Sequence, residues 1–88
     1  MRLIYTTQFK KDFKKIKKRG KEISKLINVI EILLERKNLD AKYQDHPLSG
    51  KFKDHRECHI EPDWLLIYRR TKDELILERT GSHSDLFK

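Results

Sequence analysis

The sequence predicts an α+β fold in which two helices near the N-terminus pack on one face of a sheet of short strands. Three observations support this. Apolar residues recur with helical spacing up to residue 34, a segment rich in turn residues follows, and β-branched and aromatic runs then alternate with tight connections. Because 88 residues supply only one core, we expect a single domain covering residues 1–88.

The chain is expected to begin with a strand and a lysine-covered helix. Residues 2–6 read RLIYT, and β-branched and aromatic residues favour a strand. Thr6 or Thr7 is a suitable N-cap for the helix that follows, because its hydroxyl can accept a hydrogen bond from the first turn. Apolar residues at i, i+4 and i+7 give this helix one buried stripe, and Gly20 provides its C-terminal stop.

The strongest periodic signal lies between residues 23 and 34. Apolar residues fall there at i, i+3, i+4, i+7, i+10 and i+11, namely Ile23, Leu26, Ile27, Ile30, Leu33 and Leu34. This pattern predicts a second amphipathic helix. Two helices on one face of a sheet would bury both stripes and leave the opposite face open to polar groups.

The second half of the chain is expected to consist of a long loop and three strands. Periodicity disappears between residues 38 and 53, and loops of such length are often functional. Strands are expected at residues 56–60, 64–70 and 74–80, with TKD as the tight connection between the last two. The tail GSHSDLFK is long enough for one helical turn.

Alternation along the first of these three strands separates its side chains into two sets. Cys58 and Ile60 share one face, whereas Glu57 and His59 share the other. In the last strand both sets contain apolar residues, so parity leaves open which set faces the helices.

Positive charge is concentrated in the N-terminal part. The net charge is +7, and residues 1–38 carry twelve Lys or Arg against four Asp or Glu, whereas residues 39–88 carry nine against ten. Such a field attracts phosphate backbones or an acidic protein. A solvated helix face is an equally good reading of the same lysines.

The location is predicted to be cytoplasmic. No apolar stretch approaches the ~20 residues that a membrane span needs, and the N-terminus lacks the apolar region of a signal peptide. Cys58 is a single cysteine and cannot form an internal disulfide, which fits a reducing compartment.

The sequence gives little support for a metal site, a nucleotide-binding glycine loop or a cysteine nucleophile. His55 and His59 would be ~13 Å apart along a strand, too far to share a metal ion. The three glycines stand alone, so no phosphate-binding glycine loop is present. Cys58 fits a buried free cysteine better than a nucleophile. We therefore expect no metal and no cofactor.

Acid–base chemistry by histidine and carboxylate remains. Histidine titrates near neutrality and can give or take a proton, so several histidines with an aspartate and nearby cations suit phosphodiester transesterification. RNA brings its own nucleophile, the 2′-OH. The enzyme then needs a base, an acid for the departing 5′ oxygen, and cations for the extra charge on the phosphorane.

The second half of the chain resembles a family of bacterial toxins. The stretches YQDHPLSGKFKDHRECHIEPDWLLIY and LERTGSHSDLF contain, in order, DHPL-x-G, R-x-x-H-x-x-PDW-x-L-x-Y and R-x-G-(S/T)-H, followed by a terminal Leu-Phe pair. They are similar to the YafQ branch of the RelE superfamily. This resemblance implies a RelE-like microbial ribonuclease fold with two N-terminal helices on a four-stranded antiparallel sheet. It also implies cleavage of mRNA in the ribosomal A site and an acidic antitoxin encoded alongside.

Carried over residue by residue, the resemblance implies an acid–base set of His46, His59, Asp63 and His83. His83 resembles the proton donor to the leaving group. Asp63 and His46 both remain candidates for the base, and His59 either orients a partner or holds the phosphate.

The resemblance also implies substrate contacts. Phe87 matches an aromatic residue that supports the substrate base, and the candidate phosphate contacts are Lys51, Lys53, Arg56 and Arg79. Trp64 opens an apolar strand and is expected to fill core space. Glu57 receives no role, and His55, which has no motif support, is expected at the surface.

Two other functions stay open at this point. A non-catalytic basic module that binds nucleic acid would bind in a salt-sensitive way without cleavage. A toxin directed at DNA gyrase on the same fold is not expected to retain the histidine and aspartate set.

Overall fold

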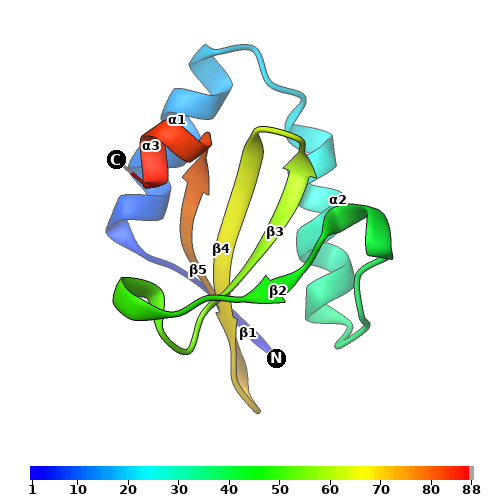
Figure 1. The fold of residues 1–88 in the computed structure, drawn as a ribbon. Coiled ribbons are helices and arrows are strands. Elements are labelled where there is room, and N and C mark those ends of the chain that lie inside the picture. Colours follow the sequence, from blue (N-terminus) through cyan, green and yellow to red (C-terminus); the bar gives the residue numbers. More distant parts are fainter. Residues whose placement is uncertain (88) are drawn as a thin grey trace.

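The computed structural model describes residues 1–87 and shows helices packed on a five-stranded sheet (Figure 1). The strands are β1 (Arg2–Tyr5), β2 (His46–Pro47), β3 (Arg56–Glu61), β4 (Trp64–Arg70) and β5 (Glu74–Gly81). The helices are α1 (Thr7–Lys18), α2 (Ile23–Leu34) and α3 (His83–Leu86), with 3₁₀ turns η1 (Ala41–Tyr43) and η2 (Gly50–Phe52). The predicted α+β class, both long helices and the three C-terminal strands are confirmed.

The sheet differs from the expected one in strand number and in one pairing. Its order is β1-β5-β4-β3-β2, and β1 runs parallel to β5 while the other neighbours are antiparallel. The fifth strand, β2, lies inside the segment predicted to be loop. A parallel pair cannot be joined by a hairpin, and here almost the whole chain lies between the two partners, so local sequence carried no signal of the pairing.

Local signals define α1 as predicted. Thr6 is the N-cap, and its Oγ1 accepts a hydrogen bond from the Phe9 backbone N–H at 3.0 Å. After the C-terminal turn the chain reverses through Gly20, whose φ of +75° is accessible to glycine without strain.

The main core lies between the two long helices and one face of the sheet. It is formed by buried residues of α1, α2 and β3–β5, namely Phe9, Ile16, Leu26, Val29, Ile30, Leu33, Cys58, Ile60, Trp64, Leu66, Tyr68, Leu75 and Leu77. Leu75 and Leu77 therefore settle the orientation of β5 that parity left open. Trp64 is fully buried, as expected, and burial raises the pKa of the Cys58 thiol far above its usual range.

The opposite face of the sheet is partly covered. A second, smaller cluster joins Leu65 and Ile67 of β4 to Phe52 of η2 and Leu86 of α3. The long loop and the C-terminal turn thus pack on this face, and Figure 1 shows β2 and α3 on the same side of the sheet.

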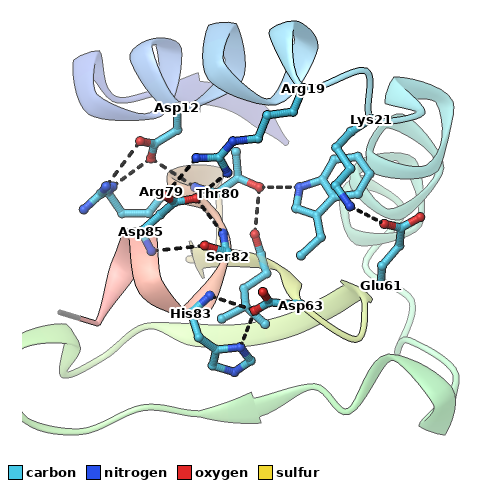
Figure 2. Close-up of polar contacts among 12 residues, drawn as sticks. Asp12, Arg19, Lys21, Glu61, Asp63, Arg79, Thr80, Ser82, His83 and Asp85 are labelled. Carbon is cyan, nitrogen blue, oxygen red and sulfur yellow. Dashed lines mark hydrogen bonds and ion pairs between the residues drawn. The ribbon is translucent and has the colours of Figure 1, made fainter.

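A buried polar network ties α1 to the end of β5 (Figure 2). Asp12 is 4% exposed, and its carboxylate accepts hydrogen bonds from the Arg79 guanidinium at 2.7 and 3.2 Å and from the Thr80 backbone N–H at 3.1 Å. The Thr80 hydroxyl donates to the Leu65 carbonyl at 2.7 Å and accepts from Trp64 Nε1 at 3.0 Å. Each buried polar group named here has a partner, as burial requires.

Within residues 1–87, no helix combines the length and apolar character needed to cross a bilayer.

The hydroxyl of Thr80 should contribute measurably to stability. Thr80→Val keeps the shape of the side chain but leaves Trp64 Nε1 without an acceptor, so we expect the free energy of unfolding to fall by about 1–3 kcal/mol. Thr7→Val, at the exposed start of α1, is the matched control and should change it by less than about 0.5 kcal/mol. Urea denaturation measures both, and equal midpoints for the two variants would contradict the role of the network.

Candidate active site

Four neighbouring parts of the fold bring the predicted catalytic residues together. His46 on β2 and His59 on β3 have ring centroids 6.3 Å apart, and the rings of His59 and His83 are 5.8 Å apart. Asp63 lies in the turn between β3 and β4, next to His83 at the start of α3. The structure therefore places all four residues in one cluster, although they are up to 37 positions apart in the sequence.

His83 and Asp63 form a direct pair (Figure 2). Asp63 Oδ1 accepts hydrogen bonds from the backbone N–H of His83 at 2.9 Å and from its Nδ1 at 2.7 Å. These contacts lower the pKa of the Asp63 carboxyl below its usual range, the backbone hydrogen bond having the largest effect. A carboxylate only accepts, so Nδ1 carries hydrogen and Nε2 is the nitrogen left for a substrate.

The turn of helix that begins with His83 is fixed from two sides. Ser82 and Asp85 form a capping box, with Asp85 Oδ2 accepting from the Ser82 N–H at 2.9 Å and Ser82 Oγ accepting from the Asp85 N–H at 3.2 Å. Arg19, after the end of α1, holds the Asp85 carboxylate with two hydrogen bonds of 2.6 and 3.0 Å. The Arg19 guanidinium and then the Ser82 N–H hold the pKa of Asp85 well below its usual range.

Glycine is required immediately before this turn. A Cβ atom at Gly81 would lie 2.9 Å from Asp85 Oδ2, closer than real Cβ contacts allow. The absence of a side chain therefore lets β5 pass directly into the capping box that presents His83.

Glu57 connects the other two histidines and is the residue whose role the sequence left open. Its Oε2 lies 3.0 Å from His46 Nε2 and 4.0 Å from His59 Nε2. The Glu57 side chain is 7% exposed, and its Oε1 is buried without a hydrogen-bond partner among residues 1–87. Strand alternation had already placed Glu57 on the face of His59, and its partner His46 comes from the register of β2 with β3.

An aromatic surface adjoins His83. Phe87 is 45% exposed, lies 6.5 Å from the His83 ring and packs edge-on against Phe52 at 5.9 Å between centroids. Lys51 places its ammonium 5.6 Å over the Phe52 ring, which puts a cation at the same end of the cluster. An exposed ring next to a candidate acid–base histidine suits stacking against a nucleobase.

The predicted phosphate contacts differ in whether a carboxylate already binds them. Lys51 and Lys53 are exposed. Arg56 pairs with Asp45, its Nε lying 3.3 Å from Oδ2, and Arg79 is held by Asp12 through two nitrogens. A phosphate contact by either arginine would therefore share its guanidinium with a carboxylate.

His55, which was expected at the surface, is partly buried. Its side chain is 17% exposed, its Nδ1 lies 3.0 Å from the Lys53 carbonyl and its Nε2 lies 3.7 Å from Glu78. The ring also packs edge-on against Phe52. His55 turns inward because the short connection after η2 leaves it beside Phe52, so it has a structural place outside the catalytic cluster.

The donor set does not resemble a metal centre. Within residues 1–87 no three His, Cys, Asp or Glu side chains converge in a geometry that could hold one ion. The cluster instead offers imidazole rings at separations of 5.8 and 6.3 Å, each beside a carboxylate. Such spacing allows two imidazoles to reach different oxygens of one phosphodiester, which is the requirement of concerted acid–base catalysis.

Comparison with known proteins identifies close relatives along the whole chain. The family described as "Bacterial toxin of type II toxin-antitoxin system, YafQ" matches residues 1–88. The mRNA interferase toxin YafQ of Escherichia coli K12 is 45% identical over 84 residues, covering 94% of this chain and 91% of that protein.

Solved structures share the fold, among them two toxins. The toxin in the crystal structure of the E. coli DinJ-YafQ complex is 43% identical, with a TM-score of 0.93 and full coverage of both chains. A metal-bound toxin from Helicobacter pylori is also 43% identical, with a TM-score of 0.91 and 99% coverage of each chain.

The ion pair of Arg19 with Asp85 should make the free energy of unfolding depend on pH. Because the pKa of Asp85 is lowered by folding, its stabilising effect is complete above the unfolded value of about 4 and declines as the pH falls toward the folded value. We expect Asp85→Asn to lower the free energy of unfolding at pH 7, and the difference from wild type to shrink steadily below about pH 4.

Urea denaturation between pH 7 and pH 2.5 measures this difference. Asp54→Asn is the matched control, because Asp54 is exposed and its positive φ of 69° is tolerated by asparagine. A difference between Asp85→Asn and wild type that stays constant over the whole range would show that the carboxylate charge is not what holds α3.

Proposed function

The chain belongs to the YafQ family of bacterial toxins of type II toxin-antitoxin systems, and on this premise we propose that it cleaves mRNA on the ribosome without a metal ion. It is an endoribonuclease of the mRNA interferase class, to which its curated E. coli relative belongs. A cognate acidic antitoxin is the proposed inhibitor, because the E. coli relative has been crystallised with DinJ. The proposal places the chain in the cytoplasm, with its substrate.

One observation carries the proposed chemistry: His83 is paired with Asp63 through Nδ1 while its ring lies 5.8 Å from His59. To act as the proton donor, His83 would enter the reaction as the imidazolium, with Nδ1–H donated to Asp63 and Nε2–H directed toward the substrate. The rings of His59 and His46 are close enough to His83 to contact other oxygens of the same phosphodiester.

The proposed reaction is transesterification within the RNA. A base removes the proton of the 2′-OH, the 2′ oxygen forms a bond to phosphorus, and the bond from phosphorus to the 5′ oxygen breaks. His83 Nε2 gives its proton to the departing 5′ oxygen. The products are a 2′,3′-cyclic phosphate and a 5′-OH, and cations near the phosphate stabilise the intermediate charge.

Substrate contacts are proposed around this centre. Phe87 would support a base beside the cleaved bond, and Lys51, Lys53, Arg56 and Arg79 would contact phosphates. The lysines of α1 are exposed along the helix and would attract the ribosome and the antitoxin in turn.

Removal of the proposed acid should abolish most of the cleavage. We expect His83→Ala to reduce mRNA cleavage about 10²- to 10⁴-fold, the range typical of general acid–base catalysis, with the fold retained because the capping box remains. His55→Gln, which alters a histidine outside the cluster, should cleave at nearly the wild-type rate once matched for folded protein. Equal rates for wild type and His83→Ala on programmed ribosomes would remove His83 from the mechanism.

The nucleophile can be identified from the substrate. A 2′-deoxy substitution at the nucleotide 5′ of the cut should abolish cleavage there, whereas the same change one nucleotide downstream should be tolerated. The downstream fragment should carry a 5′-OH, as end-labelling will show. A 5′-phosphate on that fragment would make water the nucleophile.

The same assay with EDTA decides the question raised by the metal-bound Helicobacter relative. We expect full activity in excess chelator on a ribosome-independent substrate, or on ribosomes kept intact with compensating Mg²⁺. Loss of cleavage on the ribosome-independent substrate, restored by a transition metal, would contradict the metal-free mechanism.

A further inference from the structure

A cavity that the proposed mechanism does not use adjoins the histidine cluster. Its volume is about 510 Å³, and it lies between α2, η1 and the end of β3. His59 forms part of its wall, and the same ring is 5.8 Å from the ring of His83. Gln44 forms another part, and its backbone carbonyl lies 2.7 Å from His46 Nδ1. The cavity therefore shares residues with the edge of the proposed cleavage site, and its size is within the range of ligand pockets, about 300–1,000 Å³.

Phe87 lies at the other end of the cluster. Its ring is 6.5 Å from the ring of His83, whereas His59 is the histidine that lines the cavity. A cleaved phosphodiester joins two nucleotides. If Phe87 supports the base of one of them, the other nucleotide extends past His59, toward the cavity.

Local contacts fix the turn η1 that forms one wall. Asp40 Oδ1 accepts a hydrogen bond from the Lys42 backbone N–H at 3.2 Å and so caps the turn. Gln44 ends the turn in a left-handed backbone conformation with φ of 48°. The turn is therefore held at both ends, and it presents Tyr43 and Gln44 to the cavity.

Tyr43 gives the cavity an aromatic wall. Its side chain packs on the main core, which holds the ring in place, yet the residue stays partly exposed. The Lys42 ammonium lies 5.2 Å from the centre of this ring. Aromatic rings bind bases of single-stranded RNA by stacking, and cations beside them bind the backbone. A ring and a cation on one wall therefore suit a nucleotide.

Two amide side chains reach the same cavity. Asn28 of α2 and Gln44 both line it, and both residues are exposed. The contact of Gln44 with His46 uses the backbone carbonyl, so the side-chain amide takes no part in it. An amide offers a donor and an acceptor side by side, as the edge of a base does, so these two residues can distinguish one base from another.

The charges of the lining favour an anion. The lining contains two lysines, Lys25 and Lys42, and one glutamate, Glu61. Lys21 at 3.0 Å and Lys25 at 2.8 Å both bind Glu61, and Figure 2 shows the Lys21 contact. Hydrogen bonds from Lys25 and then Lys21 lower the pKa of the Glu61 carboxyl below its usual range. Glu61 is thus neutralised by two lysines, while Lys42 contacts the Tyr43 ring and can turn to a phosphate.

We propose that this cavity binds one nucleotide of the RNA substrate, across the cleaved bond from the base at Phe87, with Tyr43 stacked on its base and Asn28 and Gln44 recognising the edge of that base. Lys42 contacts a phosphate of the same nucleotide. The inference rests on the proposed RNA cleavage and adds a specificity-determining site to it. The preference for one base at this position then depends on α2 and η1, outside the catalytic cluster.

Binding can be tested without cleavage by NMR of the backbone amides. The protein is titrated separately with adenosine, guanosine, cytidine and uridine 5′-monophosphate. At least one of them should shift the amide signals of Asn28, Tyr43 and Gln44. The shifts should largely disappear in Tyr43→Leu and persist in Tyr43→Phe, because stacking needs the aromatic ring.

Three outcomes of this titration would overturn the proposal. None of the four nucleotides shifts the cavity signals, inorganic phosphate alone reproduces the same shifts, or the signals respond to an acidic antitoxin and to no nucleotide. The second outcome would reduce the cavity to an anion site, and the third would make it a surface for a protein partner.

Single-turnover cleavage identifies the position of the bound nucleotide. RNAs with one abasic nucleotide on either side of the cut are compared with intact RNA. On the side that the cavity binds, loss of the base should slow wild-type cleavage about tenfold and should not slow Tyr43→Leu further, because both changes remove the same stack. Effects of the two changes that multiply at both positions would refute the proposal and leave the proposed function in place.

Substitution of Asn28 tests recognition of the base. Asn28→Ala should reduce the differences in cleavage rate among the four bases at this position by about tenfold. Asn38→Ala is the matched control, because Asn38 is exposed and lies outside the cavity, and it should keep the wild-type preference. Unchanged preference in Asn28→Ala would remove Asn28 from base recognition. A protein that binds nucleotides in the cavity but cuts no RNA would refute the proposed function alone.

Discussion

The hydrogen bonds of the buried Asp12 carboxylate are the interaction on which the catalytic end of the fold depends. Asp12 is the point at which α1 meets the last residues of β5, through Arg79 and the backbone of Thr80. Breaking a buried ion pair by removing one partner costs about 3–5 kcal/mol, because the other charge is left unpaired. The contact also fixes where β5 ends. Thr80 is followed at once by Gly81 and the capping box that presents His83, so a displacement of α1 would change the position of the proposed proton donor.

The active site is assembled from pairs whose members come from different elements. Asp63 in the turn between β3 and β4 meets His83 of α3, and Glu57 of β3 meets His46 of β2. His83 and His46 are thus each held by a carboxylate from a neighbouring segment. Because no single loop carries the cluster, its geometry is set by the register of the sheet and by the contact of Arg19, after α1, with Asp85 of α3.

The sequence predicted those features that depend on local spacing. The stripe of α2 appeared as apolar residues at helical intervals, and the alternation along β3 placed Glu57 beside His59. Resemblance supplied the catalytic histidines, whose roles stay predictions. The missing features are contacts between residues distant in sequence, such as the parallel pairing of β1 with β5, the ion pair of Arg19 with Asp85 and the inward position of His55. Neither periodicity nor turn chemistry contains information on such contacts, because these contacts form only when distant segments come together in the folded sheet.

Charge is divided between the site and the helix that faces away from it. Four acidic residues near the site each lie beside a basic side chain: Asp63 beside His83, Glu57 beside His46, Asp45 beside Arg56, and Asp12 beside Arg79. The lysines of α1 are exposed and have no such set of partners among the ion pairs of residues 1–87. The excess positive charge of the chain therefore resides where it can attract a distant polyanion, and the paired groups of the site keep their orientation whether or not a phosphate is present. In the proposed function, attraction by α1 and cleavage depend on different residues, so a partner that covers the lysines of α1 would reduce access to RNA without having to disturb the histidine cluster.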